Sequence, residues 1–215
     1  MGLRRSSLVG IVGGERNMMI WSQIYKENIW NGTETLSGPG SNEVSTRIAA
    51  RDIVHIVSRY GIRNVLDAAC GEGSWMPTLP GYVGMDIAPE AILRAKARHP
   101  GRQFVVADMK QLTSATKFDL VILRDVIQHV SLAEGKEMLD AAFRVVRFVL
   151  ASSYMQGKNT GIDEADALRG KAYDNDLTQP PFGLPQPMQV IPDGYEYDEP
   201  LRIRDPRKVL GLWKA

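Results

Sequence analysis

VLDAACGEGSW, residues 65–75, is an apolar run that ends at Asp67 and continues into a turn containing Gly71 and Gly73. Glycine adopts the backbone angles of a sharp turn without steric cost and lets a ligand approach the main chain closely. A buried strand followed by a glycine turn is typical of a parallel α/β sheet, in which ligands bind beyond the strand ends. We therefore predict that this stretch forms the centre of an α/β fold and of its binding site.

Apolar runs alternate with helical patterns on the C-terminal side of this turn. Strands are predicted over 64–67, 82–87, 103–107, 118–123 and 148–152, and helices over 89–98 and 131–146. Ser131 and Glu134 form a capping box at the start of the second helix. This alternation predicts a Rossmann-like, doubly wound and mostly parallel sheet. Two late apolar runs, 188–191 and 209–213, are predicted to close it as an antiparallel hairpin, for seven strands in total.

The regions flanking this core have different compositions. Helical spacing over 18–31 and 43–60, with a glycine-rich loop between them, predicts an N-terminal helical lid. Residues 1–17 are interpreted as a flexible leader. The remainder, 18–215, is predicted to be a single domain, divided into lid, core, acceptor loop and closing hairpin at 18–60, 61–152, 153–187 and 188–215.

The composition limits the class of protein. The chain has 215 residues, of which 44% are hydrophobic, so it can bury a globular core. Lys and Arg number 26 against 25 Asp and Glu, so no basic excess points to a nucleic-acid partner, and none is expected. No apolar stretch is long enough to suggest a membrane span. Cys70 is the single cysteine, which excludes an internal disulfide and favours a cytoplasmic location.

Acidic residues follow the predicted strands where each strand ends: Asp67, Asp86, Asp108 and, after an arginine, Asp125. The carboxyl ends of parallel strands meet at one edge of a sheet, so these side chains are expected to line one site. Asp86 stands one strand-helix-strand step after Asp67, where a carboxylate can accept hydrogen bonds from both ribose hydroxyls. Asp108 can accept a hydrogen bond from an adenine amino group. The apolar residues after these acids, Ile87 and Met109, can sandwich a flat base.

A nicotinamide or flavin dinucleotide is the main competing ligand. Its fingerprint requires a small residue at the last position of Gly-x-Gly-x-x-Gly. Counting from Gly71, that position is Met76, so the fingerprint fails. Asp67, just before the turn, also suits a cationic ligand better than a pyrophosphate.

The chain resembles the class I S-adenosylmethionine-dependent methyltransferases at four stretches: VLDAACGEGSW (65–75), YVGMDIAPEAI (82–92), FVVADM (104–109) and FDLVILRDVIQHV (118–130). The resemblance implies S-adenosylmethionine as cofactor and S-adenosylhomocysteine as product, with the glycine turn along the methionine part. One departure is Ala69, where the family's motif has its first glycine. The cofactor-binding residues implied are Ser41, Asp67, Ala68, Ala69, Cys70, Gly71, Gly73, Asp86, Ile87, Asp108, Met109 and Arg124.

The flanks resemble a small subgroup of these enzymes associated with carbohydrate modification, through WSQIYKENIWNG, TLSGPGS, LTQPPFGLPQP and VLGLWK. We therefore expect O-methylation of a sugar or another small-molecule hydroxyl. An amine or protein methyltransferase, a nucleic-acid methyltransferase and a binding module without turnover remain alternatives.

His129 and Asp125 are the candidate catalytic residues. If a helical turn follows the fourth strand, the two side chains share a face, with His129 as base and Asp125 either orienting it or contacting the amino group of the cofactor. Simple packing of the histidine is an equally good interpretation. No metal is expected, because these residues and Asp108 lack a known ligand spacing. Candidate lid and acceptor residues are Trp21, Tyr25, Trp30, Ser37, Tyr154, Asn175 and Phe182. The sequence does not indicate which oligomeric state the protein has.

Overall fold

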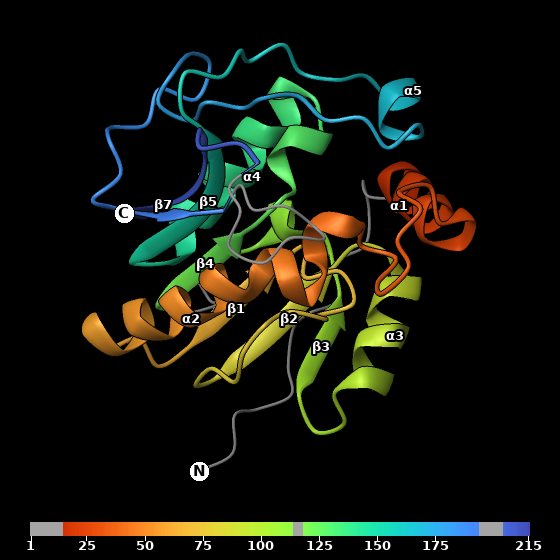
Figure 1. Ribbon diagram of the computed structural model, residues 1–215, viewed down its shortest axis with the longest axis horizontal. Coiled ribbons are helices and arrows are strands. Elements are labelled where there is room, and N and C mark those ends of the chain that lie inside the picture. Colours follow the sequence, from red (N-terminus) through yellow and green to blue (C-terminus); the bar gives the residue numbers. More distant parts are fainter. Residues whose placement is uncertain (1–14, 114–117, 194–203) are drawn as a thin grey trace.

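The computed structural model describes residues 15–113, 118–193 and 204–215, and its centre is a seven-stranded sheet (Figure 1). The strand order is β3-β2-β1-β4-β5-β7-β6. The strands are β1 Val65–Ala68, β2 Tyr82–Asp86, β3 Gln103–Val106, β4 Leu120–Leu123, β5 Phe148–Tyr154, β6 Gln189–Pro192 and β7 Lys208–Lys214. Strands β1 to β5 pair in parallel, whereas β7 runs antiparallel to both β5 and β6. The predicted Rossmann-like sheet with a closing hairpin is confirmed.

Helices form where the sequence supplies spacing and caps. They are α1 Glu15–Glu27, α2 Glu43–Arg59, α3 Pro89–Arg98, α4 Leu132–Val145 and α5 Glu164–Ala167, with short 3-10 turns η1 Pro39–Ser41, η2 Met109–Gln111 and η3 Ile127–His129. Asn42 caps α2 by accepting from the Ser45 backbone nitrogen at 2.8 Å. The hydroxyl of Ser131 accepts from the Glu134 nitrogen at 3.2 Å, as the capping box predicts.

The N-terminal boundary differs from the expectation. Helix α1 begins at Glu15, inside the stretch 1–17 that the sequence predicts to be a leader, and the rest of that stretch lies outside the described residues. The helix also ends at Glu27 rather than at residue 31, because Asn28 and Asn31 adopt positive φ angles of 48° and 51°. Asparagine tolerates this conformation better than most residues.

Two apolar cores lie on the two faces of the sheet. Alternate strand residues such as Val65 and Ile122 pack against α2 and α3, and the residues between them, such as Leu66 and Val121, pack against α4. Successive side chains of a strand point to opposite faces, so a strand covered on both sides reads as a continuous apolar run. The packing holds the strand ends in register and therefore positions the residues that follow them.

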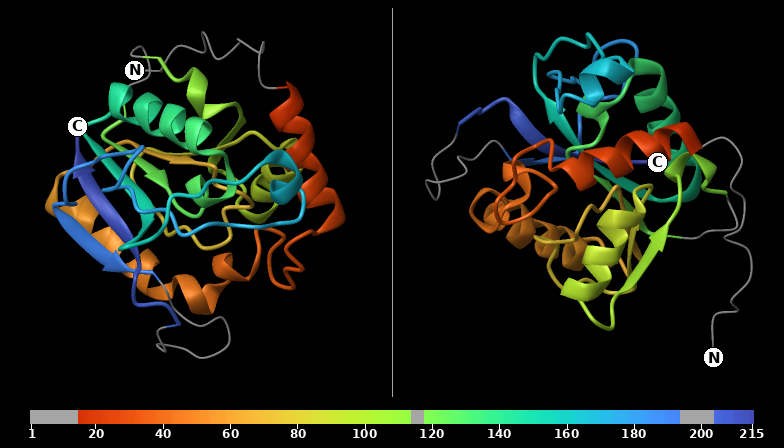
Figure 2. Two further views of the ribbon diagram at one scale, coloured as in Figure 1. Left: turned by 90° about the horizontal axis from the view of Figure 1, so that it is seen from above. Right: turned by 90° about the vertical axis from the view of Figure 1, so that its right-hand side faces the viewer.

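Two segments distant in sequence meet above one edge of the sheet. Helix α1 lies beside α5 in the views of Figures 1 and 2. The segments that follow the two helices are in close contact, because a Cβ added at Gly170 would lie 3.1 Å from both the Ile29 side chain and the indole nitrogen of Trp30. Across the described part of the chain, no helix is long and apolar enough to cross a membrane.

Candidate active site

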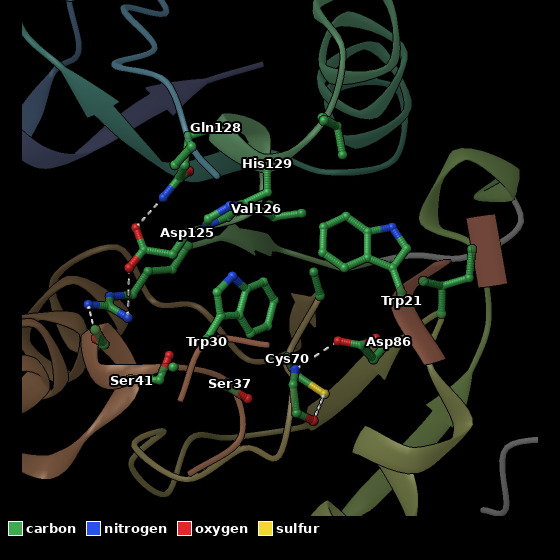
Figure 3. Close-up of a pocket in the computed structure, with 18 of the residues that line it drawn as sticks. Trp21, Trp30, Ser37, Ser41, Cys70, Asp86, Asp125, Val126, Gln128 and His129 are labelled. Atoms are coloured by element: carbon green, nitrogen blue, oxygen red, sulfur yellow. Dashed lines mark hydrogen bonds and ion pairs between the residues drawn. The ribbon is translucent and has the colours of Figure 1, made fainter. Parts of the chain in front are cut away.

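A cavity of about 470 Å³ opens at the carboxyl ends of the parallel strands (Figure 3). Its volume falls within the roughly 300–1,000 Å³ that is usual for small-molecule sites. It brings together most residues that the sequence singles out: Trp21, Tyr25, Trp30, Ser37, Ser41, Asp67, Ala69, Cys70, Gly71, Asp86, Ile87, Asp108, Met109, Arg124, Asp125, His129 and Tyr154. The fold therefore gathers the strand-end residues and the N-terminal segment at one place.

The glycine turn after β1 is built on left-handed backbone. Ala69, Gly71 and Gly73 have φ angles of 66°, 55° and 60°. Asp86 fixes the turn, because its Oδ2 accepts from the Gly71 nitrogen at 2.9 Å while Oδ1 accepts from the Ala88 nitrogen at 2.9 Å. Each carboxylate oxygen keeps a further lone pair for a ligand hydroxyl. Ala69, the departure from the family's motif, thus adopts the conformation for which glycine is favoured.

Asp67 and Asp86 are buried acids at the ends of neighbouring strands. Oδ2 of Asp67 accepts a hydrogen bond from the Tyr82 hydroxyl at 3.0 Å. Burial raises the pKa of Asp67 to about 7, although the Tyr82 hydrogen bond opposes the shift. Burial likewise raises the pKa of Asp86 to about 6. Two buried carboxyl groups with raised pKa values favour a ligand that brings positive charge.

The N-terminal segment covers the turn. The Tyr25 hydroxyl and the Ser37 Oγ are 3.1 Å apart, and Ser37 Oγ accepts from the Glu72 nitrogen at 3.2 Å. A Cβ at Gly71 would collide with the Ser37 hydroxyl and lie 2.8 Å from that of Tyr25. Glu72, 2% exposed, accepts from the Thr35 hydroxyl at 3.0 Å. The N-terminal segment and the turn are therefore packed against each other, and glycine at 71 is a steric requirement.

The residues after β2 and β3 give the cavity two apolar side chains and an acid. Ile87 and Met109 both line the cavity, as does Asp108. Oδ1 of Asp108 accepts from the Lys110 nitrogen at 2.9 Å and caps the turn η2. The Lys110 ammonium lies 2.9 Å from Oε1 of Glu134 and 3.6 Å from Oδ2 of Asp108.

His129 lies at the other end of the cavity, 5.5 Å from Trp30 between ring centroids. Its Nδ1 is 2.8 Å from the Lys171 carbonyl oxygen. A carbonyl oxygen only accepts, so Nδ1 carries the hydrogen and Nε2 keeps its lone pair. Burial lowers the pKa of His129, an effect that the Lys171 hydrogen bond and Asp125 only partly oppose. The imidazole is therefore neutral at pH 7.

Asp125 does not orient His129, which corrects the expected pairing. With a φ of 54°, Asp125 lies outside the turn η3, so the assumed helical spacing does not hold. Its Oδ1 accepts from Gln128 at 2.7 Å and from the Ser152 hydroxyl at 3.2 Å. Its Oδ2 lies 2.8 Å from the Lys208 ammonium.

Asp125 belongs instead to a buried cluster of charges with Arg124, Asp193 and Lys208. Arg124 donates to Asp193 at 3.0 Å, and its guanidinium lies 3.3 Å from Asp125. Lys208 lies 3.4 Å from Asp193. Burial alone would raise the pKa of Asp125, but Lys208 and Arg124 hold that pKa well below its usual value. Asp125 is therefore ionised and fully paired, and it is unsuited to act as a base.

Four of the sequence's candidates do not line the cavity. Ala68 is buried within β1, and the Gly73 carbonyl oxygen lies 2.8 Å from Nε2 of His99. Asn175 is buried and donates to the Ser152 carbonyl at 2.9 Å, so it connects the 155–188 segment to β5. Phe182 packs in the core against α4. The acceptor contacts expected of Asn175 and Phe182 are absent from this arrangement, because both side chains face the core.

Sequence analysis missed other residues of the site. The hairpin supplies Lys208 to the cavity lining and Asp193 behind it, and the turn η3 supplies Gln128. Tyr82 at the start of β2 and Trp75, whose ring lies 4.8 Å from the Arg124 guanidinium, were also missed. No local motif marks these residues. The only signal was the polar position of Lys208 at the start of an apolar run.

The cavity fits S-adenosylmethionine, the cofactor that the resemblance implies. The buried acids suit ribose hydroxyls and a positively charged ligand, and the apolar side chains of Ile87 and Met109 suit a flat base. Within residues 15–113, 118–193 and 204–215, no group of three or more His, Cys, Asp or Glu could hold a metal ion.

Comparison with known proteins agrees with this geometry. A family described as a methyltransferase domain matches residues 65–148, which contain β1 to β4, the turn and α4. No curated protein matches the chain.

Solved structures share the fold. The N-methyltransferase NodS from Bradyrhizobium japonicum, in complex with S-adenosylhomocysteine, has a TM-score of 0.62 at 14% identity, over 89% of this chain and 98% of that chain. Magnesium protoporphyrin IX methyltransferase from Synechocystis PCC 6803, with bound S-adenosylmethionine, has a TM-score of 0.58 at 14% identity, over 97% and 100%. The methyltransferase-domain match over residues 65–148 and the shared fold support a class I S-adenosylmethionine-dependent methyltransferase.

Proposed function

We propose that this methyltransferase methylates a hydroxyl group of a sugar or of another small molecule. The observation that carries the proposal is the hydrogen bond of His129, whose Nδ1 donates to the Lys171 carbonyl at 2.8 Å. A neutral imidazole with a free Nε2 lone pair is what removal of a hydroxyl proton requires. No described group hydrogen-bonds Nε2, and the ring lines the cavity.

S-adenosylmethionine supplies a methyl group that its sulfonium already activates. The protein then has to align the acceptor oxygen with that methyl carbon and exclude water. When bound, S-adenosylmethionine would give its methyl group to the acceptor oxygen and leave as S-adenosylhomocysteine, and Nε2 of His129 would take the hydroxyl proton. The imidazolium that results faces the Lys171 carbonyl oxygen, which continues to accept from Nδ1.

The cofactor would be held by residues that share the cavity. We assign the ribose hydroxyls to Asp86, the adenine amino group to Asp108, and the adenine ring to the apolar side chains of Ile87 and Met109. The methionine part would lie along Asp67 and Gly71, with Ser37 and Tyr25 of the 18–60 lid closing over it. The predicted division into lid, core, acceptor loop and hairpin, and the cytoplasmic location, remain part of this proposal.

An amine acceptor is the second candidate, because NodS is an N-methyltransferase of the same fold. A neutral amine has less need of a base, so His129 distinguishes the two reactions. The test is a screen of methyl glycosides, alcohols and amines with methyl-labelled cofactor, with identification of the methylated atom in the product.

The His129→Gln variant completes the test, because glutamine can donate to the Lys171 carbonyl but cannot act as a base. We expect kcat on a hydroxyl acceptor to fall by roughly 10²–10⁴, with the affinity for S-adenosylhomocysteine unchanged. Methylation confined to nitrogen would exclude the proposed reaction. Full turnover of a hydroxyl acceptor by His129→Gln would exclude His129 as the base.

A further inference from the structure

We propose that Thr35 and Glu72 are positioning residues for the cofactor, which fix Ser37 and the loop that follows it as one wall of the cavity. Residues 37–41 all line the cavity, whereas Thr35 and Glu72 lie outside its lining. Figure 3 shows Ser37 and Ser41 on one side of the cavity, with His129 on the other. The inference rests on the cofactor placement of the proposed function and is independent of the acceptor.

Three hydrogen bonds form a closed ring between this loop and the glycine turn. The Thr35 hydroxyl donates to Oε2 of Glu72 at 3.0 Å and accepts from the Ser37 nitrogen at 3.2 Å. The Ser37 hydroxyl in turn accepts from the Glu72 nitrogen at 3.2 Å. Ser37 is therefore held at both its backbone nitrogen and its side chain, and the Thr35 hydroxyl links it to the carboxylate.

The carboxylate of Glu72 faces the N-terminal segment and α3 and is closed to a ligand. The residue is 2% exposed, so its charge has to be balanced within the protein. Nε of Arg94 lies 3.6 Å from its Oε1, and Nη2 of Arg98 lies 3.5 Å from its Oε2. Arg98 also donates to the Glu34 carbonyl oxygen at 3.4 Å. The position of Glu72 in the turn thus serves to hold the 34–37 segment.

The other end of the loop is fastened as well. The Ser74 hydroxyl donates to the Ser41 carbonyl oxygen at 3.0 Å, and Arg124 donates to the Gly40 carbonyl oxygen at 2.9 Å. A loop that is fixed before a ligand binds does not have to be ordered during binding, and such preorganisation increases affinity. Opening the ring at Thr35 would free the first end of the loop and lower the affinity for the cofactor.

The experiment measures two quantities in each variant. They are the affinity for S-adenosylhomocysteine, by calorimetry, and the hydrogen exchange of residues 33–41 in the free protein, by mass spectrometry. Thr35→Val removes the hydroxyl and keeps the branched shape, whereas Thr35→Ser keeps the hydroxyl. Thermal unfolding shows whether each variant is folded.

Thr46→Val is the matched control. Thr46 is 2% exposed and Thr35 is 3% exposed, but the Thr46 hydroxyl donates to the Asn42 carbonyl oxygen at the start of α2, at 2.6 Å. Ser37→Ala opens the ring at a second point, and it serves the same comparison should Thr35→Val not fold. The double variant Thr35→Val/Ser37→Ala tests whether the two residues act as one unit.

We expect Thr35→Val and Ser37→Ala each to weaken binding of S-adenosylhomocysteine by about tenfold and to accelerate hydrogen exchange in residues 33–41. Thr35→Ser and Thr46→Val should bind within about twofold of the wild type, because both leave the ring closed. The double variant should bind at most about twofold more weakly than the weaker single variant, since either change opens the same ring.

Unchanged affinity and exchange in the folded single variants would overturn the inference. Fully additive losses in the double variant would also overturn it, because they would show two independent contacts. An equal loss in Thr46→Val would reduce the effect to general stability. If the wild type itself fails to bind S-adenosylhomocysteine, the proposed function fails, so the two failures are distinguishable.

Discussion

Tyr82 donates its hydroxyl hydrogen to Oδ2 of Asp67 at 3.0 Å, so the first residue of β2 holds the acid at the carboxyl-terminal end of β1. Both side chains are buried. Burial raises the pKa of Asp67 to about 7, and the Tyr82 hydrogen bond lowers it towards the usual value. The tyrosine therefore keeps Asp67 more ionised at neutral pH than burial alone would allow.

Tyr82→Phe should weaken cofactor binding in a pH-dependent way. Without the hydroxyl, the pKa of Asp67 rises further above about 7, and a larger fraction is protonated at pH 7. We expect the affinity for S-adenosylmethionine to fall by about tenfold at pH 7 and by less at pH 8.5, measured by calorimetry at both values. An equal loss at the two pH values would show that Tyr82 acts through packing alone.

Cofactor binding should also change how stability depends on pH. The pKa values of Asp67 and Asp86 in the folded protein, about 7 and about 6, are above the unfolded value of 3.8. The folded state therefore binds more protons, and these two groups reduce stability as pH rises from about 4 to 7. A cationic ligand favours the ionised carboxylates. The increase in Tm on adding S-adenosylmethionine should accordingly be larger at pH 7.5 than at pH 5.5, and a constant increase would contradict this assignment.

Ala69→Gly should stabilise the glycine turn. Ala69 has a φ of 66°, where a side chain costs roughly 1–2 kcal/mol, and part of the gain is offset by the greater freedom of glycine in the unfolded chain. We expect the free energy of unfolding to rise by up to about 1 kcal/mol and cofactor affinity to be retained, measured by urea denaturation and calorimetry.

Ala68→Gly is the matched control for this change. Ala68 is buried inside β1 and does not have a positive φ. Glycine at this position should therefore destabilise the protein by about 0.5–1 kcal/mol. We therefore expect Ala69→Gly to raise the free energy of unfolding and Ala68→Gly to lower it. Destabilisation by both variants would mean that Ala69 is not strained.

Lys208→Met should destabilise the protein strongly. It leaves the buried carboxylates of Asp125 and Asp193 with Arg124 as their shared cation, and breaking a buried pair costs about 3–5 kcal/mol. The control is Lys136→Met, which breaks the exposed pair of Lys136 with Asp140 on α4 at a cost below about 1 kcal/mol. Urea denaturation measures both, and equal costs would show that the cluster contributes no more than a surface pair.

Most of the fold could be predicted because its signals are local. Apolar runs separated by helical spacing predicted the parallel strands, and the capping box at Ser131 predicted where α4 begins. The ends of some elements differ from the predicted ends, because tertiary contacts decide where those elements stop. The strand β5, for instance, extends to Tyr154 because β7 pairs with it along its whole length.

The meeting of the strand-end acids in one cavity could also be predicted, whereas the surroundings of His129 could not. Asp67, Asp86 and Asp108 follow strands, and the ends of parallel strands lie at one edge of a sheet whatever else the chain does. The expected Asp125–His129 pair failed because it assumed a regular helical turn, while Asp125 adopts a positive φ and binds other groups.

The sequence by itself determined the periodicity, the turn from Asp67 to Gly73 and the order of strand-end acids, since these depend on neighbouring residues and on the geometry of parallel strands. Tertiary structure alone decided which partners the polar side chains find. Lys208 reaches Asp125 across 83 positions and Asp193 reaches Arg124 across 69, after the hairpin has packed against β5. Buried charges and donors must be paired, but several partners in a sequence can satisfy them, and only packing of the distant segments selects one.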